Sequence, residues 1–289
     1  MTQTQAILCA LAAFFCWVMC DTCIKLAAQA ELPPPAIMGI LGIIGVIGIA
    51  GGVLYKGDLA LLRPQNPRNQ AFICLCSLVG TYGTVIALKH LPLTIFYIVV
   101  FTAPLAIAVI SAFLKYEILT RTKIACLVAG FGGVLLAVAP QGGGNGEWIG
   151  YGAALISVLG FAGYTVTIRK ISQTDSTESI QFYSSLTFGI VGLLCSLDVT
   201  TPGGQAIALM IAAGILNIVA SVLYNKALGG TAATNVAQIH YTQIISGAIM
   251  GYAIWHEVPT WNLIVGSIII VASGIIVTHQ ARQGEIRPA

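Results

Sequence analysis

The sequence predicts an all-α membrane protein with ten transmembrane helices in two inverted five-helix repeats. Three observations lead to this prediction. Only 8% of the 289 residues are charged and 57% are hydrophobic, whereas a soluble domain carries about 25% charged residues. Apolar stretches recur at a length that spans a bilayer. When the second half of the chain is aligned with the first, polar residues of the two halves fall at equivalent positions. The small net charge of +3 argues against a nucleic-acid-binding protein.

Ten apolar stretches are each long enough to cross about 30 Å of hydrocarbon. Proline and glycine separate many of them, as at Pro202 and Gly203. The first stretch lacks a basic start and a clear cleavage site, so we expect a retained helix rather than a signal peptide. The predicted spans are residues 5–28, 36–55, 70–88, 92–114, 123–139, 148–168, 179–197, 205–225, 231–254 and 261–279.

Lysine and arginine predict the orientation of the chain. If the N-terminus is cytoplasmic, only Lys25 and Lys89 of the 13 Lys and Arg residues fall on the outer side. The other basic residues then lie in cytoplasmic loops and in the C-terminal tail, as the positive-inside rule requires. We therefore expect an integral protein of the bacterial cytoplasmic (inner) membrane with both termini in the cytoplasm.

The two halves of the chain are similar when shifted by 140 residues. This shift aligns Ala87 with Ala227 and Glu117 with Glu257. Each half has five spans, and an odd number turns the second half upside down relative to the first. The predicted organisation is a first repeat, a linker, a second repeat and a cytoplasmic tail, at residues 1–140, 141–146, 147–280 and 281–289.

Polar residues of the third span recur at spacings of four and three, which places them on one helix face. The shift of 140 residues leads to a second polar face in the eighth span. Polar residues in a bundle also serve as hydrogen-bonding contacts between helices, but two matched faces favour a substrate site between the repeats, near the midplane. The residues are Ser77, Thr81 and Thr84, and Asn217, Ser221 and Tyr224.

The most specific motif is APLAIAVISAFLKYEILTRTKIACLVAGFGGVLL (103–136), with a proline at 104, an acidic residue at 117 and glycines at 130 and 133. A similar copy occupies 241–276. With these motifs the chain resembles the drug/metabolite transporter superfamily, in its EamA-type branch. Within it, the chain looks most like bacterial permeases for metabolites such as S-adenosylmethionine or riboflavin. The second repeat has Tyr164 where the counterpart of Asp21 falls.

The first span contains CWVMCDTCIK (16–25), in which three cysteines surround an acidic residue. Together with Cys9, these cysteines lie on one face of the helix, but ligands from a single helix cannot close a tetrahedron around zinc. We therefore expect no metal and no cofactor, and the cysteines are interpreted as packing residues.

Asp21 and Lys25 lie on the other side of that helix, with Trp17. A charge inside a spanning helix is costly and usually faces a cavity or a partner. Two interpretations stay open: Asp21 binds a cationic part of the substrate or a coupling proton, or Asp21 and Lys25 form an internal ion pair at spacing i, i+4. Lys25 is also near enough to the interface to extend into the headgroups.

The fourth and ninth spans supply the remaining candidates. Pro104 predicts a kink near the midplane. For His240, packing is favoured over proton relay, and Glu117 and Glu257 are expected to cap or anchor helix ends. The substrate-binding candidates from these spans are Tyr97, Phe101, Gln238, Tyr241 and Thr242.

The predicted function is secondary active transport of a small polar organic metabolite, an amino acid or a cofactor-type solute such as S-adenosylmethionine, by alternating access. The alternative is a multidrug or metabolite exporter of the same fold. The sequence has no HExxH, GxSxG or P-loop motif, so an enzyme is not expected. The expected partners are a small-molecule substrate, membrane lipid and a coupling proton, and no nucleic acid.

Overall fold

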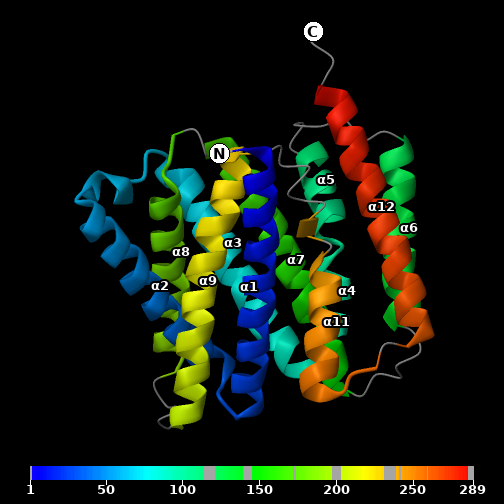
Figure 1. The fold of residues 1–289 in the computed structure, drawn as a ribbon, viewed down its shortest axis with the longest axis horizontal. Helices are drawn as coiled ribbons and strands as arrows, with labels where there is room; N and C mark the ends of the chain where they lie inside the picture. Colours follow the sequence, from blue (N-terminus) through cyan, green and yellow to red (C-terminus); the bar gives the residue numbers. More distant parts are fainter. Residues whose placement is uncertain are drawn as a thin grey trace.

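The computed structural model describes residues 2–113, 121–138, 145–171, 174–196, 203–230, 239–240, 242–258 and 260–285. Within these ranges the chain is helical, with short connecting segments (Figure 1). The elements are α1 (Gln3–Gln29), α2 (Pro34–Lys56), η1 (Leu59–Leu62), α3 (Pro67–His90), α4 (Leu93–Val100), α5 (Ala103–Phe113), α6 (Arg121–Val138), α7 (Asn145–Ile171), α8 (Thr177–Leu194), α9 (Gly204–Gly230), α11 (Thr242–Trp255) and α12 (Trp261–Glu285).

The helices lie where the sequence predicts hydrophobic stretches. In the described part of the chain, α1, α2, α3, α7 and α9 are long and apolar enough to cross a membrane, and α11 and the first half of α12 contain shorter apolar segments. Local signals set the helix ends. Thr2 and Gln5 form a capping box at the start of α1, and Gly57, in the left-handed conformation with φ of 69°, ends α2.

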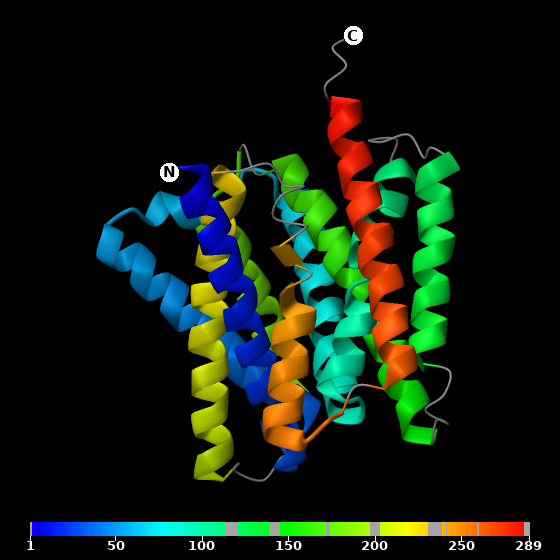
Figure 2. The ribbon, with the colours of Figure 1, turned by 45° about the vertical axis from the view of Figure 1, so that its right-hand side comes forward.

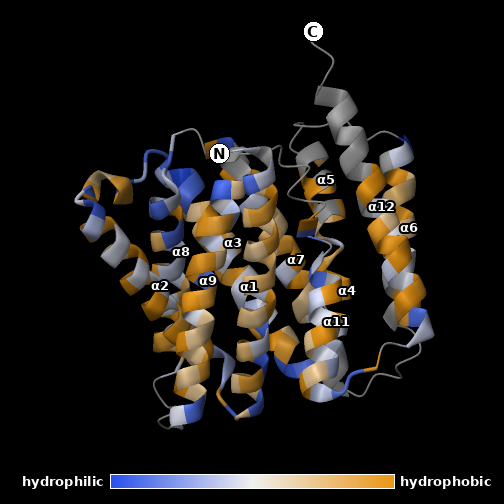
Figure 3. Cartoon of the chain, viewed as in Figure 1, coloured by the Kyte–Doolittle hydropathy of each residue, from blue (hydrophilic) through white to orange (hydrophobic). Residues whose placement is uncertain are grey.

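Large hydrophobic side chains cover the outside of the bundle. Ile47 is 66% exposed and Val128 is 69% exposed, and apolar residues predominate along the helices while polar residues gather toward their ends (Figure 3). An apolar surface of this extent is unfavourable in water, and in a bilayer it faces lipid. The protein is therefore an integral membrane protein.

Helices far apart in the sequence pack in pairs, with α1 against α9, α2 against α8, α3 against α7 and α6 against α12. The start of α1 and the end of α12 lie at the same end of the bundle (Figures 1 and 2). Glycine allows the closest approaches, because a Cβ at Gly42 on α2 would overlap the backbone of Gly189 on α8. Small residues at such contacts are typical of helix pairs in membranes.

The fourth predicted span is two helices rather than one. Helix α4 ends at Val100 and α5 begins at Ala103, and the Thr102 N–H donates to the Val99 carbonyl at 3.0 Å in the turn between them. Pro104 lies in the first turn of α5, where it has no N–H to donate to the carbonyl of Val100. The sequence predicted a kink at this proline, and the structure has a full break just before it.

Candidate functional site

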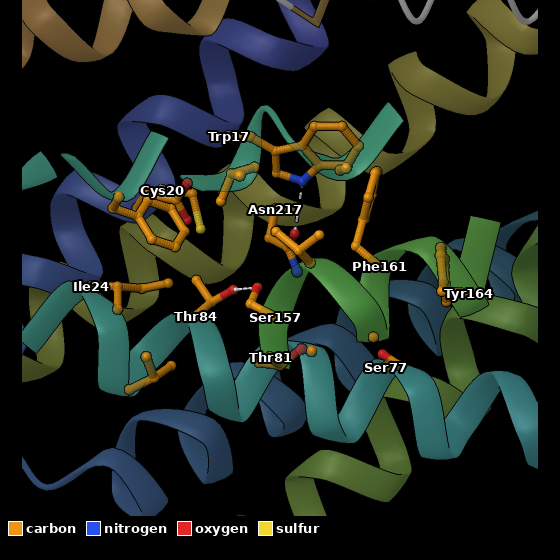
Figure 4. Close-up of a pocket in the computed structure, with 18 of the residues that line it drawn as sticks. Trp17, Cys20, Ile24, Ser77, Thr81, Thr84, Ser157, Phe161, Tyr164 and Asn217 are labelled. Atoms are coloured by element: carbon orange, nitrogen blue, oxygen red, sulfur yellow. Dashed lines mark hydrogen bonds between the residues drawn. The ribbon is translucent and has the colours of Figure 1, made fainter. Parts of the chain in front are cut away.

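A cavity of about 240 Å³ lies inside the bundle. Most of its wall comes from α1, α3, α4, α7, α8 and α9, and α2, α5 and α11 add one residue each, together with His240. Figure 4 shows the labelled side chains of α1, α3, α7 and α9 converging on it. The cavity is slightly smaller than the roughly 300–1,000 Å³ of drug-sized ligand sites, so its size suits a small metabolite.

Asp21 is the one Asp, Glu, Lys or Arg side chain among the described residues of the cavity wall. Its carboxylate accepts a hydrogen bond of 2.8 Å from the Tyr97 hydroxyl on α4. An ionised carboxylate has about four acceptor positions, and this bond uses one of them. The cavity is therefore electrostatically suited to a cationic group or a proton.

Three more hydrogen bonds join polar side chains of the cavity wall. The Trp17 indole N–H donates to Asn217 Oδ1 at 3.1 Å, between α1 and α9. The Thr84 and Ser157 hydroxyl oxygens are 2.7 Å apart, between α3 and α7, and both of these bonds are visible in Figure 4. The Gln181 amide on α8 donates to the Tyr164 hydroxyl at 3.1 Å. These bonds hold the cavity wall together across helices from both halves of the chain.

Aromatic rings surround His240 beside the cavity. The imidazole stacks on Phe14 with ring centroids 4.8 Å apart, and Phe101 and Phe161 lie at 5.4 Å and 5.9 Å. His240 is 8% exposed and lines the cavity. The ring contacts agree with the packing role favoured for His240, and its place in the wall also makes it a neighbour of any bound solute.

Lys25 does not pair with Asp21, which corrects the alternative that the spacing suggested. Its ammonium group lies 2.6 Å from Glu257 Oε1 and 4.2 Å from the ring centroid of Trp255. The carboxylate of Glu257 also accepts hydrogen bonds from the N–H groups of Leu93 and Thr94 at the start of α4. Glu257 therefore anchors a helix end, as its position in the sequence suggested.

The structure brings most of the predicted site residues to the cavity. Those in its wall are Trp17, Asp21, Ser77, Thr81, Thr84, Tyr97, Asn217 and Ser221.

Four other predicted residues are outside the cavity wall. Lys25 forms an ion pair with Glu257, and the Phe101 ring packs on those of Tyr97 and His240. The Tyr224 ring contacts those of Phe14 and Trp17. The Thr242 hydroxyl donates to the carbonyl of residue 239. Phe101 is fully buried, and Tyr224 and Thr242 are half-buried. Gln238, Tyr241 and Glu117 lie outside the described residues.

Sequence reasoning missed one wall of the cavity. Ser157, Phe161 and Tyr164 on α7 line it at spacings of four and three, and the residues predicted on α3 have the same spacings. This pattern was a usable signal, because such spacing places side chains on one helix face. Gln181 and Gln243 also line the cavity, and no pattern in the sequence marked them.

Cys20, one of the cysteines interpreted as packing residues, is buried in the hydrophobic core. It also lines the cavity, as does Cys76 on α3. In the described ranges, no three His, Cys, Asp or Glu side chains are placed to hold a metal ion.

Comparison with known proteins gives consistent matches. Residues 4–139 and 148–279 each match the EamA-like transporter family. An S-adenosylmethionine uptake transporter of Rickettsia felis is 26% identical over 72% of this chain and 69% of its own length. The pseudopaline exporter CntI of Pseudomonas aeruginosa is 28% identical over 67% of this chain and 68% of its own. A riboflavin transporter of Rhizobium johnstonii is 21% identical over 80% of this chain and 76% of its own.

One solved crystal structure resembles this fold with a TM-score of 0.68, and the match covers 98% of this chain and 99% of the other. The two sequences are 20% identical, so the likeness concerns the fold alone.

Proposed function

Because this chain belongs to the EamA-like transporter family, and is thus a transporter rather than an enzyme, we propose that it moves a small organic metabolite with a cationic group across the membrane by alternating access. The observation that carries this proposal is Asp21, the single charged Asp, Glu, Lys or Arg side chain in the described cavity wall. A carboxylate in a low-dielectric site attracts a cation strongly. The rings of Trp17 and Tyr97 beside it add cation–π attraction.

S-adenosylmethionine is the substrate that we place first. Its sulfonium and ammonium groups are cationic and its adenine ring is flat, which fits an acidic cavity with aromatic walls. The relatives named as S-adenosylmethionine uptake transporters support this choice. The relative named as an exporter supports the opposite direction of transport, so the transport assay measures flux in both directions.

We further propose that residues 1–140 and 147–280 are inverted repeats of five spans each, joined by a linker at 141–146 and followed by a tail at 281–289. Two observations support this. The family match falls in two segments of similar length, and the packing of α1 on α9 has a counterpart in that of α3 on α7. In inverted-repeat transporters the substrate site lies between the repeats, and the cavity has walls from both halves.

The proposed orientation in the bacterial inner membrane has both termini in the cytoplasm. The start of α1 and the end of α12 share one end of the bundle (Figure 1). That end also carries the end of α2 with Lys56 and the start of α6 with Arg121. Basic residues gathered on one side favour the cytoplasmic face.

The transport proposal is tested in proteoliposomes with labelled S-adenosylmethionine. We expect saturable flux that other organic cations inhibit. Asp21→Asn should lower the apparent affinity about 10- to 150-fold, because hydrogen bonds to charged groups contribute about 1.5–3 kcal/mol each. Glu31→Gln, which changes an exposed acidic residue just beyond α1, is the matched control.

The same assay, run across a range of pH, tests proton coupling at Asp21. Unchanged flux and unchanged pH dependence in Asp21→Asn would refute the role given to this residue. The absence of saturable flux for every cationic metabolite tested would refute the function itself.

A further inference from the structure

The cavity has two chemically different ends, separated along helices α3 and α7. These helices are antiparallel and in close contact, with Gly80 next to Gly160. Thr84 and Ser157 meet at one end of the contact, and Ser77 and Tyr164 lie seven residues away on their respective helices, at the other end (Figure 4). Seven residues of helix span about 10 Å, so the cavity is elongated.

Helix α1, which carries Asp21, borders the cavity near the end marked by Thr84. Its labelled residues Cys20 and Ile24 lie on that side of the view in Figure 4, whereas Tyr164 lies on the opposite side. The charged site therefore occupies one end of the cavity and leaves the other end to a different part of the solute.

The far end carries neutral hydrogen-bonding groups next to an aromatic ring. The Gln181 amide uses one N–H to bond the Tyr164 hydroxyl at 3.1 Å. Among the described residues this is its one side-chain partner, and an amide also has a second N–H and a carbonyl oxygen. A glutamine amide pairs in bidentate fashion with an adenine-type edge, which offers a donor beside an acceptor. Phe161, on the same face of α7, offers its ring for stacking.

The hydrogen bond between Gln181 and Tyr164 joins α8 to α7, and it leaves the second N–H and the carbonyl oxygen of the amide for a solute. A hydrogen bond between α7 and α8 alone would stabilise the bundle, but Tyr164, Gln181 and Ser77 all line the cavity. Polar groups inside a membrane protein are costly unless they find partners. A solute with polar atoms at this end supplies such partners.

We propose that Tyr164, Gln181 and Phe161 form a subsite for a planar heteroaromatic group, a nucleobase or a ring like it, on the same solute whose cationic group binds at Asp21. The inference rests on the proposed function and narrows its substrate class to cationic nucleosides. A cation without such a ring fills only the Asp21 end, and a nucleoside without a cation fills only the far end.

Binding measurements on the purified full chain, with three probes, test the subsite. S-adenosylmethionine has both groups, S-methylmethionine has the sulfonium without the base, and 5′-methylthioadenosine has the base without the cation. Wild type should bind S-adenosylmethionine most tightly. Gln181→Leu should weaken that binding about 5- to 150-fold, the effect of one bidentate pair, and leave the affinity for S-methylmethionine within about twofold.

Two further variants keep the result interpretable. Tyr164→Phe preserves the ring and its packing, and should show the same selective loss if Gln181→Leu fails to fold. Gln205→Leu, at an exposed position in the first turn of α9, should leave all three affinities unchanged.

Three outcomes would overturn the subsite. If wild type binds S-adenosylmethionine and S-methylmethionine equally, the cation site stands and the subsite is wrong. The subsite is also wrong if Gln181→Leu and Tyr164→Phe weaken both probes to the same degree. If wild type binds none of the three probes, the subsite is wrong, and the transport assay with other organic cations decides separately whether the proposed function stands.

Discussion

Removal of the Glu257 carboxylate should destabilise the protein strongly. Lys25 is 5% exposed, and Glu257→Gln leaves its ammonium group without the counter-charge that now lies 2.6 Å away. Loss of one partner of a buried ion pair costs about 3–5 kcal/mol. At roughly 2–4 °C per kcal/mol for a chain somewhat shorter than this one, the melting temperature should fall by roughly 6–20 °C.

The assay is thermal unfolding of the purified protein in detergent, with a second ion pair as the internal control. The Lys56 ammonium nitrogen lies 2.7 Å from Glu178 Oε1, but the two side chains are 57% and 28% exposed. Exposed pairs contribute about 0–1 kcal/mol, so Glu178→Gln should lower the melting temperature by only a few degrees.

A double variant separates charge burial from lost packing. Lys25→Met combined with Glu257→Gln removes both charges, and it should recover part of the stability lost by Glu257→Gln. The reasoning is wrong if Glu257→Gln and Glu178→Gln have the same melting temperature, or if the double variant is less stable than Glu257→Gln.

Two further predictions concern packing and pH. Gly42→Ala should lower the free energy of unfolding by about 1–3 kcal/mol, because its Cβ would overlap the backbone of Gly189. Gly51→Ala, with open space around the new Cβ, should leave that free energy unchanged or raise it by up to about 1 kcal/mol. Equal melting temperatures of the two variants would contradict this. Burial alone would raise the pKa of Asp175, but hydrogen bonds from the Asn66 side chain and from backbone N–H groups outweigh it and lower the pKa. A lowered pKa stabilises the fold above the unfolded value near 3.9, so the stability advantage over Asp175→Asn should be complete at pH 6 and shrink below about pH 4; a constant difference across this range would contradict it.

Helical periodicity predicted the α3 side of the cavity well. Ser77, Thr81 and Thr84 line the cavity as their spacing suggested, because a helix fixes which residues share a face. Local backbone chemistry likewise located the break near Pro104. These features depend on neighbouring residues, which the sequence displays directly.

Tertiary pairing could not be predicted in the same way. Lys25 stands at the i, i+4 position from Asp21, but its partner is Glu257 and Asp21 binds Tyr97. Helical spacing shows which side chains of one helix can meet, whereas the partner that a side chain actually bonds depends on which other helix lies nearer. Gln181 was missed for the same reason, since its place in the cavity wall depends on α8 packing beside α7 rather than on a local pattern.

The capping of α4 by Glu257 also has a consequence for biosynthesis. Lys25 and Glu257 are 232 residues apart in the sequence, and at about 5–20 residues per second a ribosome needs roughly 10–50 s to cover that distance. Throughout this interval the first helices are already made, while Lys25 lacks its counter-charge and α4 lacks its cap. The nascent chain therefore lacks this ion pair and the cap on α4 until almost its last helix emerges.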